Sequence, residues 1–179
     1  MINPNKKRLR RSMMFLNAQK PSLIKDPYIY KADSLMLDLE DAVAANQKDS
    51  ARFSLYHALT TIDYRGSEKV VRINGLDTDL WKEDIRCCVA GGAEVIRIPK
   101  TEDAGMVKAV EDEIIKAEKE FHRPEGFTLI MSALESAKGV MNAYEVCTSS
   151  ERMIGVALSG GDYTKDLQTR ITGTGVELM

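Results

Sequence analysis

The sequence is poor in the residues that build disulfide frameworks, zinc sites and histidine-dependent catalytic centres. Its 179 residues include three cysteines, two of them adjacent, and two histidines. No Cys-x-x-Cys pair occurs, which argues against a structural zinc site, and an odd cysteine count argues against a disulfide framework. His57 and His122 lie within or at the end of polar helical stretches, so the sequence gives no indication of a Ser-His-Asp triad. The cysteine usage fits a reducing compartment, and we expect a cytoplasmic protein.

Long apolar runs and a charge excess are also missing. No run of 18 apolar residues occurs, so we expect no membrane-spanning helix. The formal net charge is −2, which gives no general field for attracting nucleic acid or an anionic membrane. We therefore expect neither nucleic acid nor a membrane as a partner. The 44% hydrophobic and 29% charged fractions are typical of a globular domain.

The sequence does contain six short apolar segments, each followed by a helical stretch. The segments occupy positions 11–16, 34–39, 69–74, 94–99, 127–132 and 153–158. Most are nearly continuously apolar, which is typical of strands buried on both faces of a parallel sheet. The helical stretch at 101–121 suggests Thr101 as its N-cap and Met106 and Ile114 on its buried face.

This strand–helix alternation indicates βαβ units, which fit either an open doubly wound sheet or most of a (β/α)8 barrel. An open nucleotide-binding sheet should carry a glycine-rich phosphate loop after its first strand, but the sequence there is LNAQKP. We favour an α/β fold of the (β/α)8 TIM-barrel type with about six βα units. We read residues 1–179 as a single, incomplete barrel domain, cut short within a helix at TGVELM.

Polar side chains follow the carboxyl ends of the expected strands, where barrel enzymes build their sites. They are Glu40 and Asp41, Arg72 and Asn74, Lys100, Glu135, and Asp162, after the second to the sixth strand in turn. In a parallel sheet these side chains should converge at one edge.

Glu135 and Asp162 suit a hard cation. Two carboxylates without a histidine or thiolate partner favour Mg²⁺, which keeps waters or substrate oxygens in its other positions. Gly160 and Gly161 would let a ligand approach the backbone closely. Taken singly, each carboxylate also fits a helix N-cap or a solvated turn.

Arg72 is a permanent cation among apolar strand residues, in KVVRINGLDT. If it is buried it needs a partner, and Glu40 or Asp41 could supply one. Arg72 then belongs either to a structural ion pair or to a site that holds a substrate carboxylate. A metal ion beside an arginine could chelate a 2-oxo or 2-hydroxy acid and stabilise a developing alkoxide or enolate, which suits aldol-type C–C cleavage.

Six motifs occur together and in order: RRSMMFL, DSLMLDLEDAV with KDSAR, VVRINGLDT, VIRIPKTE, LIMSALESAKGVMNAYEV and ALSGGDYTKDLQTR. In this combination the chain closely resembles the citrate lyase beta subunit (citryl-CoA lyase), within the HpcH/HpaI aldolase-like family. The resemblance implies a (β/α)8 barrel that assembles as an oligomer. It also implies Mg²⁺-dependent cleavage of a citryl thioester to oxaloacetate and an acetyl thioester. An alpha subunit and an acyl carrier subunit would be its partners.

Carried over by motif, the resemblance makes Glu135 and Asp162 metal ligands and makes Arg72 and Glu135 substrate contacts. Glu40 and Asp41 become the carboxylate pair that supports Arg72 in catalysis. The chain has Asn17 and Ala18 where the family commonly has Pro-Gly, which affects the cofactor-side loop. Relatives draw further site residues from a C-terminal region that is missing here, so the resemblance names no general base.

Three other interpretations stay open at this stage. One is a lyase for malyl- or citramalyl-CoA, which a substrate panel separates from a citryl-thioester lyase. Another is a non-catalytic incomplete barrel that only binds partner subunits. An open-sheet nucleotide binder is the third, and it predicts saturable nucleotide binding.

Overall fold

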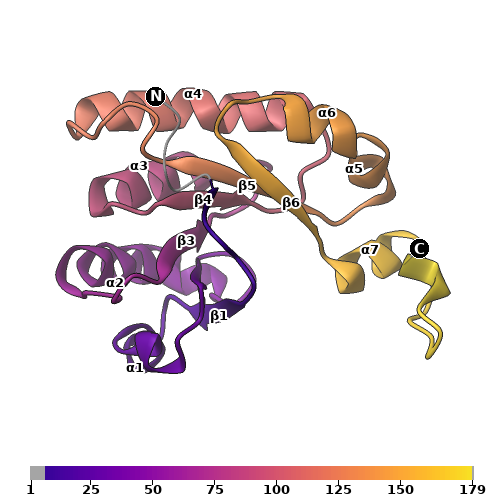
Figure 1. Ribbon diagram of the computed structural model, residues 1–179, viewed down its shortest axis with the longest axis horizontal. Helices are drawn as coiled ribbons and strands as arrows, with labels where there is room; N and C mark the ends of the chain where they lie inside the picture. Colours follow the sequence, from indigo (N-terminus) through magenta and orange to yellow (C-terminus); the bar gives the residue numbers. More distant parts are fainter. Residues whose placement is uncertain (1–6, 179) are drawn as a thin grey trace.

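A single parallel sheet organises the chain. The structure is a computed structural model and describes residues 7–178. Six strands lie in the order in which they occur in the sequence, and each pairs in parallel with the next (Figure 1). They are β1 (Met13–Asn17), β2 (Ser34–Asp38), β3 (Glu68–Arg72), β4 (Val95–Ile98), β5 (Leu129–Leu134) and β6 (Met153–Leu158). The six strands and the βαβ alternation expected from the sequence are thereby confirmed.

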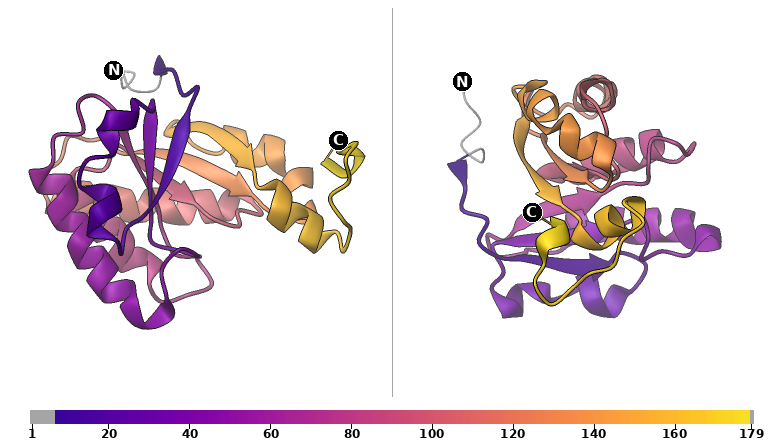
Figure 2. Two further views of the ribbon diagram at one scale, coloured as in Figure 1. Left: turned by 90° about the horizontal axis from the view of Figure 1, so that it is seen from below. Right: turned by 90° about the vertical axis from the view of Figure 1, so that its right-hand side faces the viewer.

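Helices follow the strands and cover one face of the sheet (Figures 1 and 2). The three longest, α2, α3 and α4, lie side by side, with α3 in the middle. The helices are α1 (Pro21–Ile24), α2 (Lys48–Thr61), α3 (Trp81–Gly91), α4 (Ala104–Glu120), α5 (Ala137–Met141), α6 (Ala143–Thr148) and α7 (Gly160–Asp166). Short 3-10 turns are η2 (Pro27–Tyr30), η3 (Ala45–Gln47) and η4 (Val176–Leu178).

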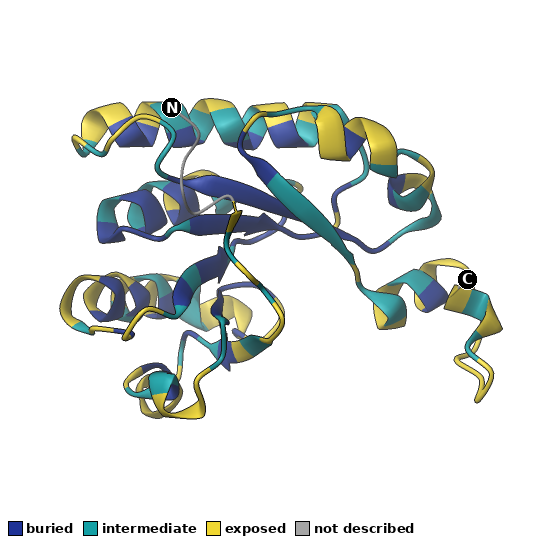
Figure 3. Ribbon diagram, in the orientation of Figure 1, coloured by how far each residue is buried: buried dark blue, intermediate teal, exposed yellow. Residues whose placement is uncertain are grey.

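The main hydrophobic core lies between the sheet and these helices (Figure 3). On α2, the apolar spacing read from the sequence puts Ala51, Leu55, Ala58 and Leu59 into this core. α3 ends at Gly91 because Gly92 adopts the left-handed conformation, with a φ of 83°, that terminates a helix at low cost.

The start of α4 differs from the expectation. Asp103, and not Thr101, is the N-cap, and its carboxylate accepts a hydrogen bond from the Met106 amide at 3.1 Å. Thr101 is instead buried in the loop after β4, where its amide donates to the Ala133 carbonyl at 2.9 Å. The N-cap thus lies two residues later than expected. Val107, and not Met106, is the buried residue in the first turns of α4, and Met106 is only half-buried.

The opposite face of the sheet carries two layers of side chains that are aligned by strand register. The first layer is apolar and consists of Met36, Val70, Val95 and Leu129, which are cross-strand partners on β2 to β5. Two residues further along each strand, the same face carries Asp38, Arg72 and Arg97, again in register. The charged layer therefore lies at the carboxyl ends of the strands, where barrel enzymes place their sites.

The sheet is curved but not closed. Within residues 7–178, β1 pairs only with β2 and β6 pairs only with β5. β6 is largely half-buried, and α7 projects from the body beside the exposed C-terminal end of the chain (Figures 1 and 3). In the described range no helix combines the length and the hydropathy that crossing a bilayer would require.

Candidate active site

Arg72 and Asp38 form the centre of the charged layer. The Arg72 Nε donates to Asp38 Oδ1 at 2.8 Å and its Nη2 donates to Asp38 Oδ2 at 2.6 Å. Burial alone would lower the pKa of Arg72, but the hydrogen bonds and charge of Asp38 more than offset this, so that pKa is raised. Arg72 therefore stays charged and has a fixed orientation.

Asp38 also organises the loop that follows β2. Its two carboxylate oxygens accept the backbone amides of Glu40 at 2.9 Å and Ala42 at 3.2 Å. From α2, the ammonium of Lys48 donates to the carbonyls of Leu39 at 2.7 Å and Glu40 at 2.6 Å. The loop carrying Glu40 is thus held from both sides.

Glu40 connects two cations. Its Oε2 lies 3.1 Å from Arg72 Nη1 and its Oε1 lies 2.9 Å from Lys100 Nζ. Burial raises the pKa of the Glu40 carboxyl above its ordinary value, although Lys100 and Arg72 act in the opposite direction. Its neighbour Asp41 is exposed, and its carboxylate approaches Arg72 Nη1 only to 3.8 Å. The two members of the predicted carboxylate pair therefore lie in different environments.

Glu135 follows β5 and is buried at the same edge. Within the described residues, its Oε2 is enclosed and has no hydrogen-bond partner. Burial raises the pKa of this carboxyl; the backbone amide of Lys100 opposes the shift, while the negative charges of Glu40 and Asp162 increase it. Among the described residues, Glu135 therefore has a buried carboxylate oxygen to which no group donates a hydrogen bond.

Asp162 lies in the first turn of α7 and is exposed. Its Oδ2 accepts a hydrogen bond from Ser159 Oγ at 2.8 Å. In the described range, no group of three or more histidine, cysteine, aspartate or glutamate side chains is arranged to hold a metal ion. A site built from Glu135 and Asp162 would have two protein ligands, a number that suits Mg²⁺ completed by water and substrate oxygens.

Asn74 takes a structural role instead of joining these side chains. Its amide nitrogen and its backbone N–H both donate to Asp84 Oδ2 on α3, at 2.7 and 2.9 Å. The other oxygen of Asp84 accepts from Arg52 Nε at 2.9 Å. Asn74 thereby ties the end of β3 to the helix layer.

Two residues of the charged layer were not among the predicted site residues. Asp38 was read as part of the apolar strand, although it is the bidentate partner of Arg72 and Glu40 contributes a further contact. Arg97 stands in VIRIP, a pattern equivalent to the KVVRIN of Arg72, so the same reasoning would have found it. Its side chain is 6% exposed.

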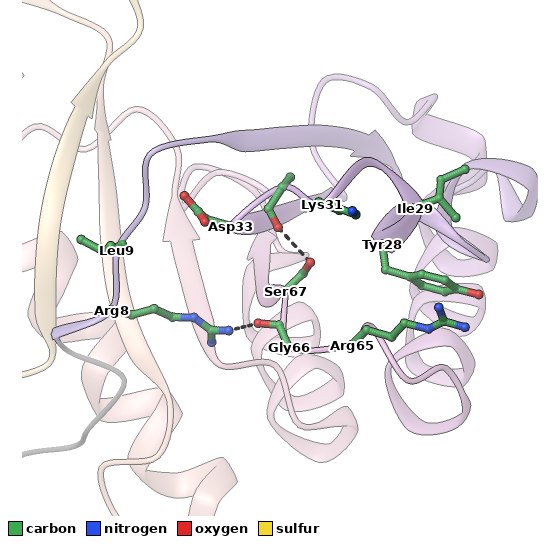
Figure 4. A pocket seen from close by; sticks show the side chains of 10 residues that line it. Arg8, Leu9, Tyr28, Ile29, Lys31, Asp33, Arg65, Gly66 and Ser67 are labelled. Atoms are coloured by element: carbon green, nitrogen blue, oxygen red, sulfur yellow. Dashed lines mark hydrogen bonds between the residues drawn. The ribbon is translucent and has the colours of Figure 1, made fainter.

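A cavity of about 610 Å³ lies at the opposite, amino ends of β2 and β3 (Figure 4). Several of its polar groups are already paired. Arg8 donates to the Gly66 carbonyl and pairs with Glu94, and Asp33 pairs with Arg11. Figure 4 also shows the Arg65 guanidinium close to the Tyr28 ring, at 4.3 Å from its centroid. None of the predicted site residues lines this cavity.

The family model for the HpcH/HpaI aldolase/citrate lyase family matches residues 11–179. The chain belongs to this family. It is 54% identical over 175 residues to the citrate lyase subunit beta of Leuconostoc mesenteroides subsp. cremoris, covering 98% of this chain and 58% of that protein. With the citrate lyase subunit beta of Escherichia coli K12 it shares 42% identity over 178 residues, covering 99% of this chain and 59% of that protein.

A solved structure of the citrate lyase beta subunit from M. tuberculosis, complexed with oxaloacetate and magnesium, superposes with a TM-score of 0.70. The two chains are 25% identical, and the match covers 96% of this chain and 68% of that one. These likenesses confirm the family and the barrel-type fold expected from the sequence. The chain spans somewhat more than half the length of the two curated relatives.

Proposed function

We propose that this chain carries part of the active site of a Mg²⁺-dependent carbon–carbon lyase. Its substrate is a citryl thioester, citryl-CoA or the citryl form of an acyl carrier protein, and its products are oxaloacetate and an acetyl thioester. The observation that carries the proposal is the arrangement at the carboxyl edge of the sheet. There a rigidly held arginine, Arg72, lies in one electrostatically coupled cluster with Glu135, whose buried Oε2 lacks a partner.

The residues present fit a magnesium ion. Glu135 Oε2 is a desolvated anionic oxygen without a donor, and Asp162 is close enough for its charge to raise the pKa of Glu135. Glu135 and Asp162 are the residues that would hold the ion. When bound, Mg²⁺ supplies Lewis-acid stabilisation of negative charge on a substrate oxygen.

Arg72 has the role of binding and orienting the substrate. A guanidinium has five N–H donors; Asp38 engages Nε and Nη2 along one edge of the group, and Glu40 lies beside Nη1. The remaining N–H groups of Nη1 and Nη2 can donate to a carboxylate of the oxaloacetate half. Because Arg72 is already fixed by Asp38, little side-chain entropy is lost when the substrate binds.

Glu40 and Asp41 support this arrangement from the loop after β2. Glu40 bridges Arg72 and Lys100, and so sets the distance between two cations at the edge of the site. Asp41 adds negative potential from the solvent side at 3.8 Å from Arg72. Both act on the orientation and the charge of Arg72.

We further propose that the chain works within an assembly in a reducing cytoplasm. An alpha subunit and an acyl carrier subunit are the expected partners, and the chain itself forms a homo-oligomer. The three cysteines are free, which agrees with a reducing compartment. In the part of the chain that the structure describes, the outer sides of β1 and β6 are unpaired, and exposed strand edges tend to pair with another chain.

The decisive experiment is a Mg²⁺-dependent assay of oxaloacetate release from citryl-CoA, read by coupling to NADH oxidation. Malyl-CoA and citramalyl-CoA in the same assay separate the related lyase activities. Release of oxaloacetate that EDTA abolishes and Mg²⁺ restores supports the proposal. An inactive protein that still binds the acyl carrier subunit would instead support a partner-binding role without catalysis.

A further inference from the structure

Arg97 is a buried cation that forms no direct ion pair with the described residues. It lies on β4 directly opposite Arg72 on β3, and its side chain is 6% exposed. Within residues 7–178, its guanidinium makes no hydrogen bond and no ion pair, and its Nε is completely enclosed. Its guanidinium lies near the Phe15 ring, whose centroid is 5.4 Å from Cζ.

The Phe15 ring does not neutralise this charge. It is shared, because Arg72 Cζ lies 5.5 Å from the same centroid, and it is half exposed. A cation–π contact at an exposed ring is much weaker than a buried ion pair. Burial and the positive charge of Arg72 lower the pKa of Arg97 by more than the carboxylates of Glu135, Asp38 and Glu40 raise it, so the free protein holds this cation at a cost.

The neighbouring carboxylates are already committed to other partners. Asp38 is engaged by Arg72, and Glu40 bridges Arg72 and Lys100. Glu135 and Asp162 are assigned to the metal ion under the proposed function. Arg97 is therefore the one arginine of the charged layer that forms no ion pair with a described carboxylate, although the negative charges of Glu135, Asp38 and Glu40 raise its pKa from a distance.

We propose that Arg97 binds the second carboxylate of the substrate and so selects dicarboxylic 2-oxo acids over monocarboxylic ones. This inference rests on the proposed function, in which the first carboxylate is bound beside the metal and Arg72. Adjacent parallel strands lie about 4.8 Å apart, a spacing comparable with the span of a four-carbon dicarboxylate. Two arginines in register on β3 and β4 can thus hold the two ends of oxaloacetate.

The consequence is specificity for a citryl thioester. That substrate presents two free carboxylates, whereas a malyl or citramalyl thioester presents one. With a substrate that has one free carboxylate, the buried guanidinium of Arg97 would stay unpaired. A site whose buried polar group must pair with a substrate group binds substrates without that group much more weakly. Arg97 is accordingly a specificity-determining residue, and Arg72 serves the carboxylate that all these substrates share.

The test compares the binding of oxaloacetate and of pyruvate, both with saturating Mg²⁺, by isothermal titration calorimetry. In the Arg97→Met variant we expect oxaloacetate to bind about ten- to hundredfold more weakly, while pyruvate changes less than about threefold. Arg97→Lys should restore part of the oxaloacetate affinity. Arg86 is half-buried on the outer surface of α3, away from the charged layer. The control Arg86→Met should change the affinity for neither ligand.

Thermal melting of the ligand-free protein distinguishes this role from a structural one. Arg97→Met removes an unpaired buried charge, so its Tm should stay the same or rise. Arg152 is equally buried but is paired with Glu118 at 2.7 Å, so Arg152→Met should lower the Tm.

Three results would overturn the inference. One is an unchanged oxaloacetate affinity in Arg97→Met, and another is an equal loss for pyruvate, which would place Arg97 on the shared carboxylate. The third is a decrease in the Tm of Arg97→Met as large as the decrease in Arg152→Met. If the unmodified protein binds neither acid, the proposed function fails and the inference fails with it.

Discussion

Asp38 and Arg72 lie opposite each other in register on β2 and β3 and close a bidentate ion pair, with N–O distances of 2.8 and 2.6 Å. Both side chains are largely buried, and both are also tied to the loop that carries Glu40. Removing one partner of a buried pair leaves a desolvated charge behind, which is far more costly than losing an exposed pair. The pair therefore contributes to stability, and it fixes the orientation of the arginine that we propose binds the substrate.

We predict that Asp38→Asn lowers the free energy of unfolding by about 2–4 kcal/mol, because Arg72 keeps only its contacts with Glu40 and Asp41. The matched control is Asp41→Asn, an exposed acid near the same arginine, which should cost less than about 0.5 kcal/mol. Urea denaturation with a check for a constant m-value measures both. Equal losses in the two variants would show that the bidentate pair has no special role.

For Glu40→Gln, we predict a larger effect on turnover than on metal binding. The variant loses the charge that holds Arg72 and Lys100, so kcat with citryl-CoA should fall about tenfold or more. Its Mg²⁺ affinity, measured calorimetrically, should change less than about threefold. Complete loss of metal binding with substrate affinity intact would instead make Glu40 a metal ligand.

The metal assignment predicts that Glu135→Gln and Asp162→Asn each weaken Mg²⁺ binding at least about tenfold, because each removes a charged oxygen from a hard cation with few protein ligands. Glu83→Gln is a suitable control, since Glu83 pairs with Arg86 on the outer surface of α3. Titration with Mg²⁺ or Mn²⁺ provides the readout without requiring activity. An unchanged affinity in both site variants would remove these residues from the metal site.

The fold could be predicted from the sequence because its signals are local. Apolar runs of strand length, helical periodicity on α2 and the Gly91–Gly92 stop each act over a few residues. The start of α4 was misplaced because a tertiary contact decides it. The Thr101 amide bonds to the Ala133 carbonyl of β5, which keeps Thr101 out of the helix.

Only part of the site could be predicted from the sequence, because its side-chain contacts depend on the register between the strands. Asp38 and Arg72 are 34 residues apart, and no local sequence pattern indicates that their side chains pair. Asp38 ends β2 in register with Arg72, whereas Glu40 and Asp41 lie in the loop that follows, where Glu40 is buried and Asp41 is exposed. Arg97 occupies the position in VIRIP that Arg72 occupies in KVVRIN, so the reasoning applied to Arg72 would have added Arg97 to the site.

The last prediction concerns Tyr64, which lies between α2 and β3 and is 3% exposed. Its hydroxyl donates to the Ile24 carbonyl at 2.8 Å, and burial raises its pKa from 10.0 to about 12. Between these two values the unfolded chain releases this proton and the folded chain retains it. The unfolded state then binds fewer protons, so stability is intact below pH 10 and is lost as the pH rises toward 12.

Tyr64→Phe should therefore be less stable than the unmodified protein at pH 7, by about 1 kcal/mol for the lost hydrogen bond. The gap should narrow above pH 10 and reverse before pH 12, because the phenylalanine variant has no phenol to titrate and each pH unit changes stability by at most about 1.4 kcal/mol. Tyr30→Phe, at a side chain that is 67% exposed, should leave the pH profile unchanged. Urea unfolding from pH 8 to 12 measures the three profiles, and a gap that stays constant would mean that Tyr64 titrates as it does in the unfolded chain.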